Sequence, residues 1–229
     1  MKTIGLLGGM SWESTVTYYQ IVNETIKSRL GGLHSAKVVL YSVDFAEIEE
    51  FQAKGQWDES AKALSAAAQA LERAGADFIV ICTNTMHKVA PQIQTGIGIP
   101  ILHIAEATAD DLCKHGIAKV ALLGTKYTMT QEFYKDKIAA AGIEVIVPDE
   151  PDIDLVNRVI YGELCLGVVS EASRRQYVDI ISKLAERGAQ GVILGCTEIG
   201  LLISQKDTPL PIFDTTRIHA EKAALLALV

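Results

Sequence analysis

Cysteine is scarce in this sequence, since the 229 residues include only four and no two of them form a Cys-x-x-Cys pair. Such wide spacing argues against a disulfide framework and against a zinc site built from paired thiolates. The five histidines show no metal-ligand spacing either. We therefore expect reduced thiols, no bound metal and a cytoplasmic location.

Long apolar runs and positive charge are also missing. No segment approaches the roughly 18 apolar residues of a membrane-spanning helix. The first residues, Met1–Leu7, lead into a strand-like segment without the features of a signal peptide. The net charge of −7 argues against nucleic acid or an anionic membrane as the main partner. A small acidic ligand stays compatible, because backbone amides at a helix N-terminus bind anions even on an acidic protein.

Cofactor motifs are absent as well. The glycine-rich segment Gly5–Gly9 follows a strand-like run but matches neither GxGxxG nor GxxxxGK[ST]. No motif marks a lysine that would form a Schiff base with pyridoxal phosphate. We expect no cofactor.

Eight short strand-like runs alternate with longer, alanine-rich helical patterns such as 57–74 and 173–187. This alternation predicts βαβ units and a largely parallel sheet. Because the runs are apolar throughout, we expect the strands to be buried on both faces. The runs are Ile4–Leu7, Lys37–Ser42, Phe78–Ile81, Ile101–His103, Val120–Leu123, Val145–Val147, Val192–Leu194 and Ile212–Phe213.

An internal repeat predicts two similar lobes. Three segments recur in the same order at nearly constant spacing, which is hard to ascribe to chance. They are Ile4–Gly8 with Val120–Gly124, Gly75–Ile81 with Gly188–Leu194, and Pro100–Leu102 with Pro211–Phe213. We predict an α/β fold of two lobes related by a pseudo-two-fold axis, with the active site in the cleft between them. Residues 1–95 with about 210–229 would form the N-terminal lobe, and residues 96–209 the C-terminal lobe.

The repeat also aligns two chemically interesting segments, 81–85 and 194–198, so that Thr83 corresponds to Cys196. Each segment follows a strand, where backbone N–H groups and a helix dipole favour a carboxylate ligand. The same field is expected to lower the pKa of Cys196. Cys82 stands one residue earlier than Thr83 and should point to the opposite face, into the lobe.

These segments carry a family resemblance. Cys82–His87 and Gly195–Glu198, together with the opening Gly8–Thr15, resemble the signatures of the aspartate/glutamate racemase family. Within that family the chain is most similar to the enterobacterial L-aspartate/glutamate-specific (broad-specificity) amino-acid racemases. The resemblance covers essentially the whole chain and implies two pseudo-symmetric α/β lobes and a homodimer.

The resemblance implies racemisation of a free amino acid by two-base proton transfer at Cα, without pyridoxal phosphate. Most family members have a cysteine in both motifs, whereas here Thr83 stands before Asn84 and would pair with Cys196. A thiolate is a competent base, but a threonine hydroxyl only donates a proton or relays one from water. We therefore expect an enzyme that works better from one enantiomer than from the other.

The expected substrate-binding residues come from both motifs and from the resemblance. Glu198 stands where it could receive the proton of Cys196, and the side chains of Asn84, Thr85 and Thr197 are expected to hold the α-carboxylate. The resemblance adds Met10 and Gln52 to the substrate pocket.

The cationic pair that grips the distal carboxylate in relatives with acidic substrates has no counterpart here. Phe45 or Ala46 and Cys165 occupy the corresponding places. Aspartate and glutamate are the expected substrates, with a range that extends to other amino acids.

Two alternative functions stay open from the sequence, and so does the role of His87. One is a related enzyme: a hydantoin racemase, a maleate isomerase or an arylmalonate decarboxylase, the last of which needs only one protonating thiol. Another is a non-catalytic carboxylate-binding protein in which Thr83 has replaced a catalytic cysteine. His87, one turn beyond Thr83, would act as a proton relay or as a positioning group.

Overall fold

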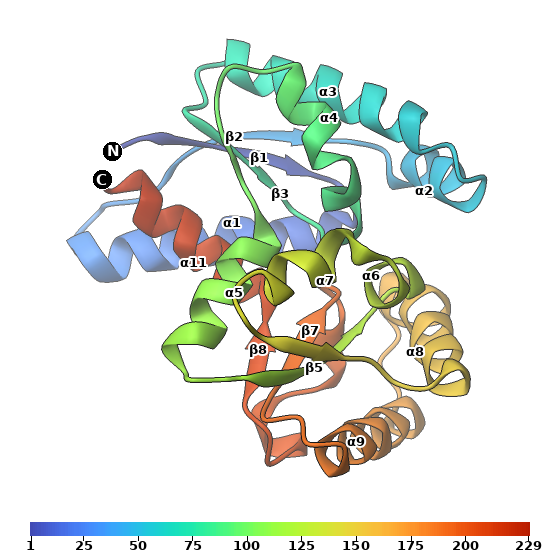
Figure 1. Ribbon diagram of the computed structural model, residues 1–229. Helices are drawn as coiled ribbons and strands as arrows, with labels where there is room; N and C mark the ends of the chain where they lie inside the picture. The colour runs from blue at the N-terminus through green and yellow to red at the C-terminus, as the bar shows by residue number, and fades with distance from the viewer. The chain divides into compact units, whose positions relative to one another are not determined.

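The structure is a computed structural model that describes residues 1–229, and its contacts divide the chain into two compact units. Unit 1 comprises Met1–Ile104 and Thr216–Val229, and unit 2 comprises Ala105–Thr215. All eight predicted strands form, and each unit is an α/β layer structure (Figure 1).

Each unit follows the predicted alternation of strands and helices. The elements of unit 1 are β1 (Thr3–Gly8), α1 (Trp12–Leu30), β2 (Lys37–Ser42), α2 (Phe45–Ala53), α3 (Trp57–Arg73), β3 (Phe78–Ile81), the 3-10 helix η1 (Thr85–Val89), α4 (Ala90–Thr95), β4 (Ile101–Leu102) and α11 (Thr215–Ala227). Those of unit 2 are α5 (Ile104–Lys114), β5 (Lys119–Gly124), α6 (Lys126–Thr130), α7 (Glu132–Ala139), β6 (Glu144–Ile146), α8 (Glu150–Gly162), η2 (Leu164–Leu166), α9 (Glu171–Glu186), β7 (Val192–Gly195), α10 (Ile199–Leu202), η3 (Gln205–Asp207) and β8 (Ile212–Asp214).

The two sheets have the same topology. The strand order is β2-β1-β3-β4 in unit 1 and β6-β5-β7-β8 in unit 2, and every pair is parallel. The first strand of each unit lies at the centre and pairs with the third, where Ile4 is opposite Phe78 and Ala121 is opposite Val192. The prediction of a duplicated, parallel α/β unit is therefore confirmed.

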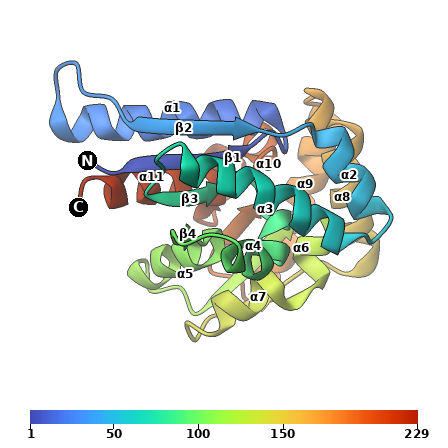
Figure 2. The same ribbon diagram turned by 90° about the horizontal axis from the view of Figure 1, so that it is seen from above.

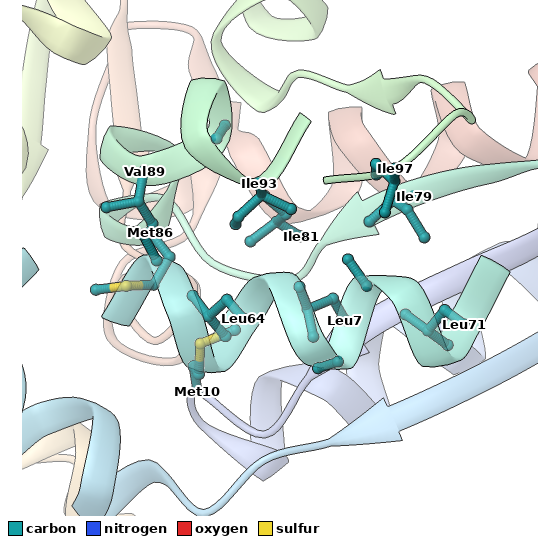
Figure 3. Packing of buried hydrophobic residues seen from close by; sticks show 14 of the residues in the cluster. Leu7, Met10, Leu64, Leu71, Ile79, Ile81, Met86, Val89, Ile93 and Ile97 are labelled. Carbon is teal, nitrogen blue, oxygen red and sulfur yellow. The ribbon is translucent and has the colours of Figure 1, made fainter. Parts of the chain in front are cut away.

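In unit 1, alternate residues of the strands bury two separate cores. Leu7, Ile79 and Ile81 pack with α3, η1 and α4 on one face of the sheet (Figure 3). Ile4 and Leu6 pack with α1 and α11 on the other face. Figure 1 shows this layering, with α3 and α4 above the strands and α1 and α11 below. Strand positions near the site are therefore fixed from both faces.

The last helix closes unit 1 beside the first strand. The backbone N–H of Lys2 donates to the carbonyl of Ala227 at 2.8 Å, so both termini lie at the same end of the unit (Figure 2). Small residues of α11 make this approach possible, because Ala220, Ala223 and Ala224 are fully buried in the core that α1 shares. The last helix thus completes the unit that contains the first strand.

The unit boundaries lie further along the chain than the sequence suggested. The repeat predicted lobe boundaries near residues 95 and 210, before the fourth strand of each repeat. In the structure β4 pairs with β3 and β8 pairs with β7, so each fourth strand stays with the sheet that precedes it. The chain therefore passes from one unit to the other only where α5 and α11 begin.

Unit 2 buries its apolar residues in the same manner. Helices α6, α8 and α9 contact the central strand β5. The aromatic rings of Tyr134 and Tyr177 are fully buried, and Tyr177 donates a hydrogen bond from its hydroxyl to the carbonyl of Val156 at 3.0 Å. None of the helices of the chain is both long and apolar enough to cross a membrane.

Candidate active site

The first half of the candidate site lies where β3 ends. The amide of Cys82 still donates to Leu7 in the sheet, whereas the amide of Thr83 turns back to the carbonyl of Ile81 at 2.9 Å. Thr83 is therefore the first residue to leave the sheet, and it is partly exposed. The next two residues, Asn84 and Thr85, are buried as η1 begins.

His87 holds this turn from inside unit 1. Its Nδ1 lies 2.8 Å from the carbonyl oxygen of Thr83, and its backbone amide donates to the carbonyl of Asn84 at 3.1 Å. The ring is 1% exposed. The backbone at Thr83 is thus fixed by a buried side chain as well as by the sheet.

The second half of the candidate site lies where β7 ends. The thiol of Cys196 donates to Oε2 of Glu198 at 3.0 Å, and the hydroxyl of Thr197 donates to the same oxygen at 2.7 Å. Cys196 is 8% exposed and Glu198 is 4% exposed. This contact puts the carboxylate of Glu198 within hydrogen-bond reach of the Cys196 proton, and its role as the acceptor stays a prediction.

The expected lowering of the pKa of Cys196 is wrong. Burial raises the pKa of the thiol well above its usual value, and the nearby charge of Glu198 raises it further. The helix that was expected to favour a thiolate is only the four-residue α10, Ile199–Leu202, so its dipole is small. In this structure Cys196 is a thiol that donates to a carboxylate.

Two further groups lie near Cys196 in unit 2, Cys165 and Tyr177. Cys165, which is partly exposed, adds to the raised pKa of Cys196, and Cys196 in turn helps to raise the pKa of Tyr177. Burial of Tyr177 raises its pKa far above the usual value, so its hydroxyl stays protonated. Sequence reasoning missed Tyr177 because its position in the middle of an amphipathic helix is typical of an ordinary core residue.

Cys82 lies where the one-residue shift predicted. It is 0% exposed and belongs to the core shared by β1, α1 and α11, on the face opposite to that of Ile81. Its thiol is 3.6 Å from the carbonyl of Val80, and burial raises its pKa far above the usual value. Cys82 is therefore a packing residue.

The two residues that the resemblance placed in the substrate pocket are both buried. Met10 is 3% exposed and lies beside Leu64 in the core cluster of Figure 3. Gln52 is 5% exposed in α2, whose Ile48 belongs to the same cluster. The same cluster contains Met86 of η1, which follows β3, so the segment around Met10 and helix α2 both pack near the end of β3. Their contact with substrate stays a prediction.

The rest of the opening motif has a structural role. The hydroxyl of Ser11 accepts from the amide of Ser14 and caps α1, while the hydroxyl of Thr15 accepts from the amide of Gly9 at 2.8 Å. Gly9 has a φ of 94°, and a Cβ there would lie 2.3 Å from the carbonyl oxygen of Val43. Only glycine fits this turn. The motif therefore shapes the entry to α1.

Each unit thus brings together its own set of predicted residues. Unit 1 gathers Thr83, Asn84 and Thr85 after β3, and unit 2 gathers Cys196, Thr197 and Glu198 after β7. In parallel α/β sheets the carboxyl ends of the strands are the usual place of ligand binding. At these strand ends each unit has hydroxyl and amide groups that can bind the carboxylate of a ligand. Unit 2 also has a thiol with a proton acceptor beside it.

Comparison with known proteins identifies related sequences and structures. The family model for Asp/Glu/hydantoin racemases matches residues 7–223. The broad specificity amino-acid racemase RacX of Bacillus subtilis is 26% identical over 225 residues, which cover 95% of each chain.

Two crystal structures match over their whole length and over the whole of this chain. A candidate Asp/Glu racemase from Yersinia pestis is 57% identical with a TM-score of 0.94. An aspartate racemase homologue from Pyrococcus horikoshii is 38% identical with a TM-score of 0.87.

Proposed function

Since this chain belongs to the Asp/Glu/hydantoin racemase family, we propose that it is a cofactor-independent amino-acid racemase in which Thr83 and Cys196 act on opposite faces of Cα. The observation that carries the proposal is the hydrogen bond from the thiol of Cys196 to Glu198 at 3.0 Å. This hydrogen bond places a proton acceptor next to a sulfur that can act as a base, at the end of a parallel strand. Thr83 occupies the equivalent strand end in the other repeat.

In the proposed reaction, the thiol proton of Cys196 passes to Glu198, and the thiolate removes the proton from Cα. The electron pair of the C–H bond moves into the α-carboxylate, where hydroxyl and amide donors of Asn84 and Thr197 stabilise the negative charge. The hydroxyl of Thr83 then delivers a proton to the other face of Cα and regains one from water, and the hydroxide so formed takes up the proton held by Glu198. In the reverse direction Glu198 takes a proton from water, and the resulting hydroxide removes the hydroxyl proton of Thr83, so that the Thr83 oxygen relays the proton from Cα. The thiol of Cys196 then protonates the other face and regains its proton from Glu198.

The raised pKa of Cys196 keeps the thiol protonated in the free protein, so transfer of its proton to Glu198 is an uphill step that must be coupled to removal of the proton from Cα. A free thiolate would be consumed by oxidants and metals, whereas a thiol beside a carboxylate is deprotonated only when the proton has somewhere to go. A bound substrate would also remove water from the site and strengthen the interaction between Cys196 and Glu198. General acid–base catalysis of this kind contributes about 10²–10⁴ in rate.

For the substrate, we propose aspartate and glutamate, with activity on further amino acids. The similarity to the candidate Asp/Glu racemase of Yersinia pestis and the aspartate racemase homologue of Pyrococcus horikoshii favours the acidic pair, and the similarity to the broad specificity racemase RacX favours a broad range. Cys165 is partly exposed near Cys196, and the family resemblance matches it to a position where relatives with acidic substrates carry a cation. An uncharged pocket wall there favours a broader range than a fixed guanidinium or ammonium group would.

We also propose a homodimer in the cytoplasm. The dimer rests on the family resemblance, and light scattering after size-exclusion chromatography tests it. The location rests on the four free cysteines, of which Cys113 is exposed and Cys165 partly exposed, because such thiols persist in a reducing compartment.

Chiral chromatography of single amino acids after incubation with the protein tests the proposed function. Formation of the opposite enantiomer by the wild-type chain, but not by Cys196→Ala, is the expected result. Turnover of arylmalonate or maleate without racemisation of any amino acid would instead favour one of the related enzymes. Tight amino-acid binding without turnover would favour a binding protein.

A further inference from the structure

His87 connects two separate segments of unit 1 through both ring nitrogens. Nδ1 lies 2.8 Å from the carbonyl oxygen of Thr83, and Nε2 accepts the backbone N–H of Ile104 at 3.1 Å. Thr83 follows β3 and Ile104 follows β4, which are neighbouring strands of the sheet. The imidazole therefore ties the ends of two strands together directly behind Thr83.

These contacts fix the protonation state of the ring. The amide of Ile104 can only donate, so Nε2 carries no proton, and the carbonyl of Thr83 can only accept, so Nδ1 carries one. Burial and the neighbouring His103 lower the pKa of His87 well below its usual value, which keeps this single neutral tautomer. A ring with one fixed tautomer and no exposed nitrogen is suited to holding a backbone and not to carrying protons.

The other half-site has no histidine at the equivalent position. His87 stands four positions after Thr83, and the residue four positions after Cys196 is Gly200. A Cβ at Gly200 would lie 3.3 Å from Oδ2 of Asp214, so a larger side chain there would crowd that carboxylate. Cys196 is held instead by its own side chain, through Glu198. In the threonine half-site a buried side chain also holds the backbone of the proposed reactive residue.

We propose that His87 is a positioning residue, which holds the backbone of Thr83 so that its hydroxyl is aligned with the substrate Cα. This inference rests on the proposed function. A threonine hydroxyl is a weak acid and has no neighbouring carboxylate in the role of Glu198, so its contribution depends on alignment. Misplacement of a reacting group by about 1 Å costs about 10² in rate.

Two substitutions separate alignment from packing. His87→Phe keeps a ring in the core but removes both hydrogen bonds, and His87→Asn keeps an amide that donates near the Nδ1 position. We expect kcat to fall 10- to 100-fold in His87→Phe with KM changed less than threefold, and to recover in part in His87→Asn. His219→Gln is the matched control, because His219 is a fully buried histidine of the same unit whose ring packs against that of His87, with 5.8 Å between ring centroids. Its hydrogen bonds go to Tyr18 and Leu102 and not to Thr83.

Deuterium isotope effects on kcat/KM, measured with Cα-deuterated L and D substrates, distinguish alignment from a loss of fold. If His87 aligns Thr83, the step at Thr83 becomes more rate-limiting in His87→Phe. The isotope effect then rises for the enantiomer whose Cα–H faces Thr83 and falls for the other, in the same sense as in Thr83→Ser. His219→Gln should keep the wild-type isotope effects.

Two results overturn the inference. Wild-type isotope effects in both directions for His87→Phe and His87→Asn would mean that His87 serves packing alone. So would wild-type kcat in both variants. A wild-type protein that exchanges no Cα–H removes the proposed function, and this inference with it. If His87→Phe fails to fold, the same isotope effects in His87→Asn decide the question.

Discussion

Acid should destabilise unit 1 through its buried histidines, and His219 allows the size of the effect to be worked out. The ring is 0% exposed and accepts a hydrogen bond from the hydroxyl of Tyr18 at 2.9 Å, while its Nε2 donates to the carbonyl of Leu102 at 2.8 Å. Burial, the neighbouring His87 and the charge of Lys222 lower the pKa of His219 from 6.5 to about 3. In the folded chain this ring is therefore neutral throughout the mildly acidic range.

The sign of the effect follows from proton linkage. Between pH 6.5 and pH 3 the unfolded chain binds a proton at His219 that the folded chain does not, so the free energy of unfolding falls as the pH falls. From pH 7 to pH 5 the loss is about 2 kcal/mol for this one group. His87 adds a loss in the same direction, because its pKa is also lowered by burial.

The assay is urea unfolding followed by tryptophan fluorescence at pH 7, 6 and 5. Both tryptophans, Trp12 and Trp57, belong to unit 1, so their emission reports on the unit that contains His219. His219→Gln keeps a donor for Leu102 but cannot titrate. It should lose about 2 kcal/mol less than the wild type between pH 7 and pH 5. An equal loss in the two proteins would refute the pKa and the protonation state assigned to His219.

Three further predictions concern the sulfur and hydroxyl groups. Cys196→Ala should abolish Cα–H exchange, whereas Cys82→Ala should keep the activity and lower the free energy of unfolding by about 1–2 kcal/mol, measured by urea unfolding. A dead Cys82→Ala variant that folds normally would overturn the alignment of the two repeats. Thr83→Cys should make kcat in the two directions more equal, as chiral chromatography would show, and unchanged asymmetry would remove Thr83 from the proposed pair. Glu198→Gln should lower kcat about 10²-fold or more, because the proton acceptor is lost. The same change should lower the pKa of Cys196, so that alkylation of Cys196 at pH 8, followed by peptide mass spectrometry, becomes faster. Slower alkylation would contradict the charge effect of Glu198.

The sequence predicted the strands well because their apolar runs are short, β-branched and buried on both faces. The run at Phe78–Ile81 is an example, with all four residues buried in the structure. The orientation of Cys82 also followed from strand periodicity alone, since a side chain at the next position must point to the other face. The ends of the lobes were harder to predict, because the pairing of the short strand β4 with β3 is a non-local contact.

The electrostatics of the site could not be read from the sequence. A cysteine before a helix suggests a lowered pKa, but the helix after Cys196 is short and the thiol is buried beside a carboxylate. Burial and through-space neighbours decided the outcome, and neither has a local signature. The contacts of His219 with Tyr18 and Leu102 were missed for the same reason, since these residues are far apart in the chain.

Proton NMR of L-aspartate and L-glutamate in D₂O tests the central claim most directly. With the wild-type chain, the account predicts loss of the Cα–H signal and formation of the D enantiomer, detected by chiral analysis of the same sample. Cys196→Ala should leave the signal intact. Exchange that persists in Cys196→Ala, or no exchange by the wild type with these two acids and a wider amino-acid panel, would contradict the account.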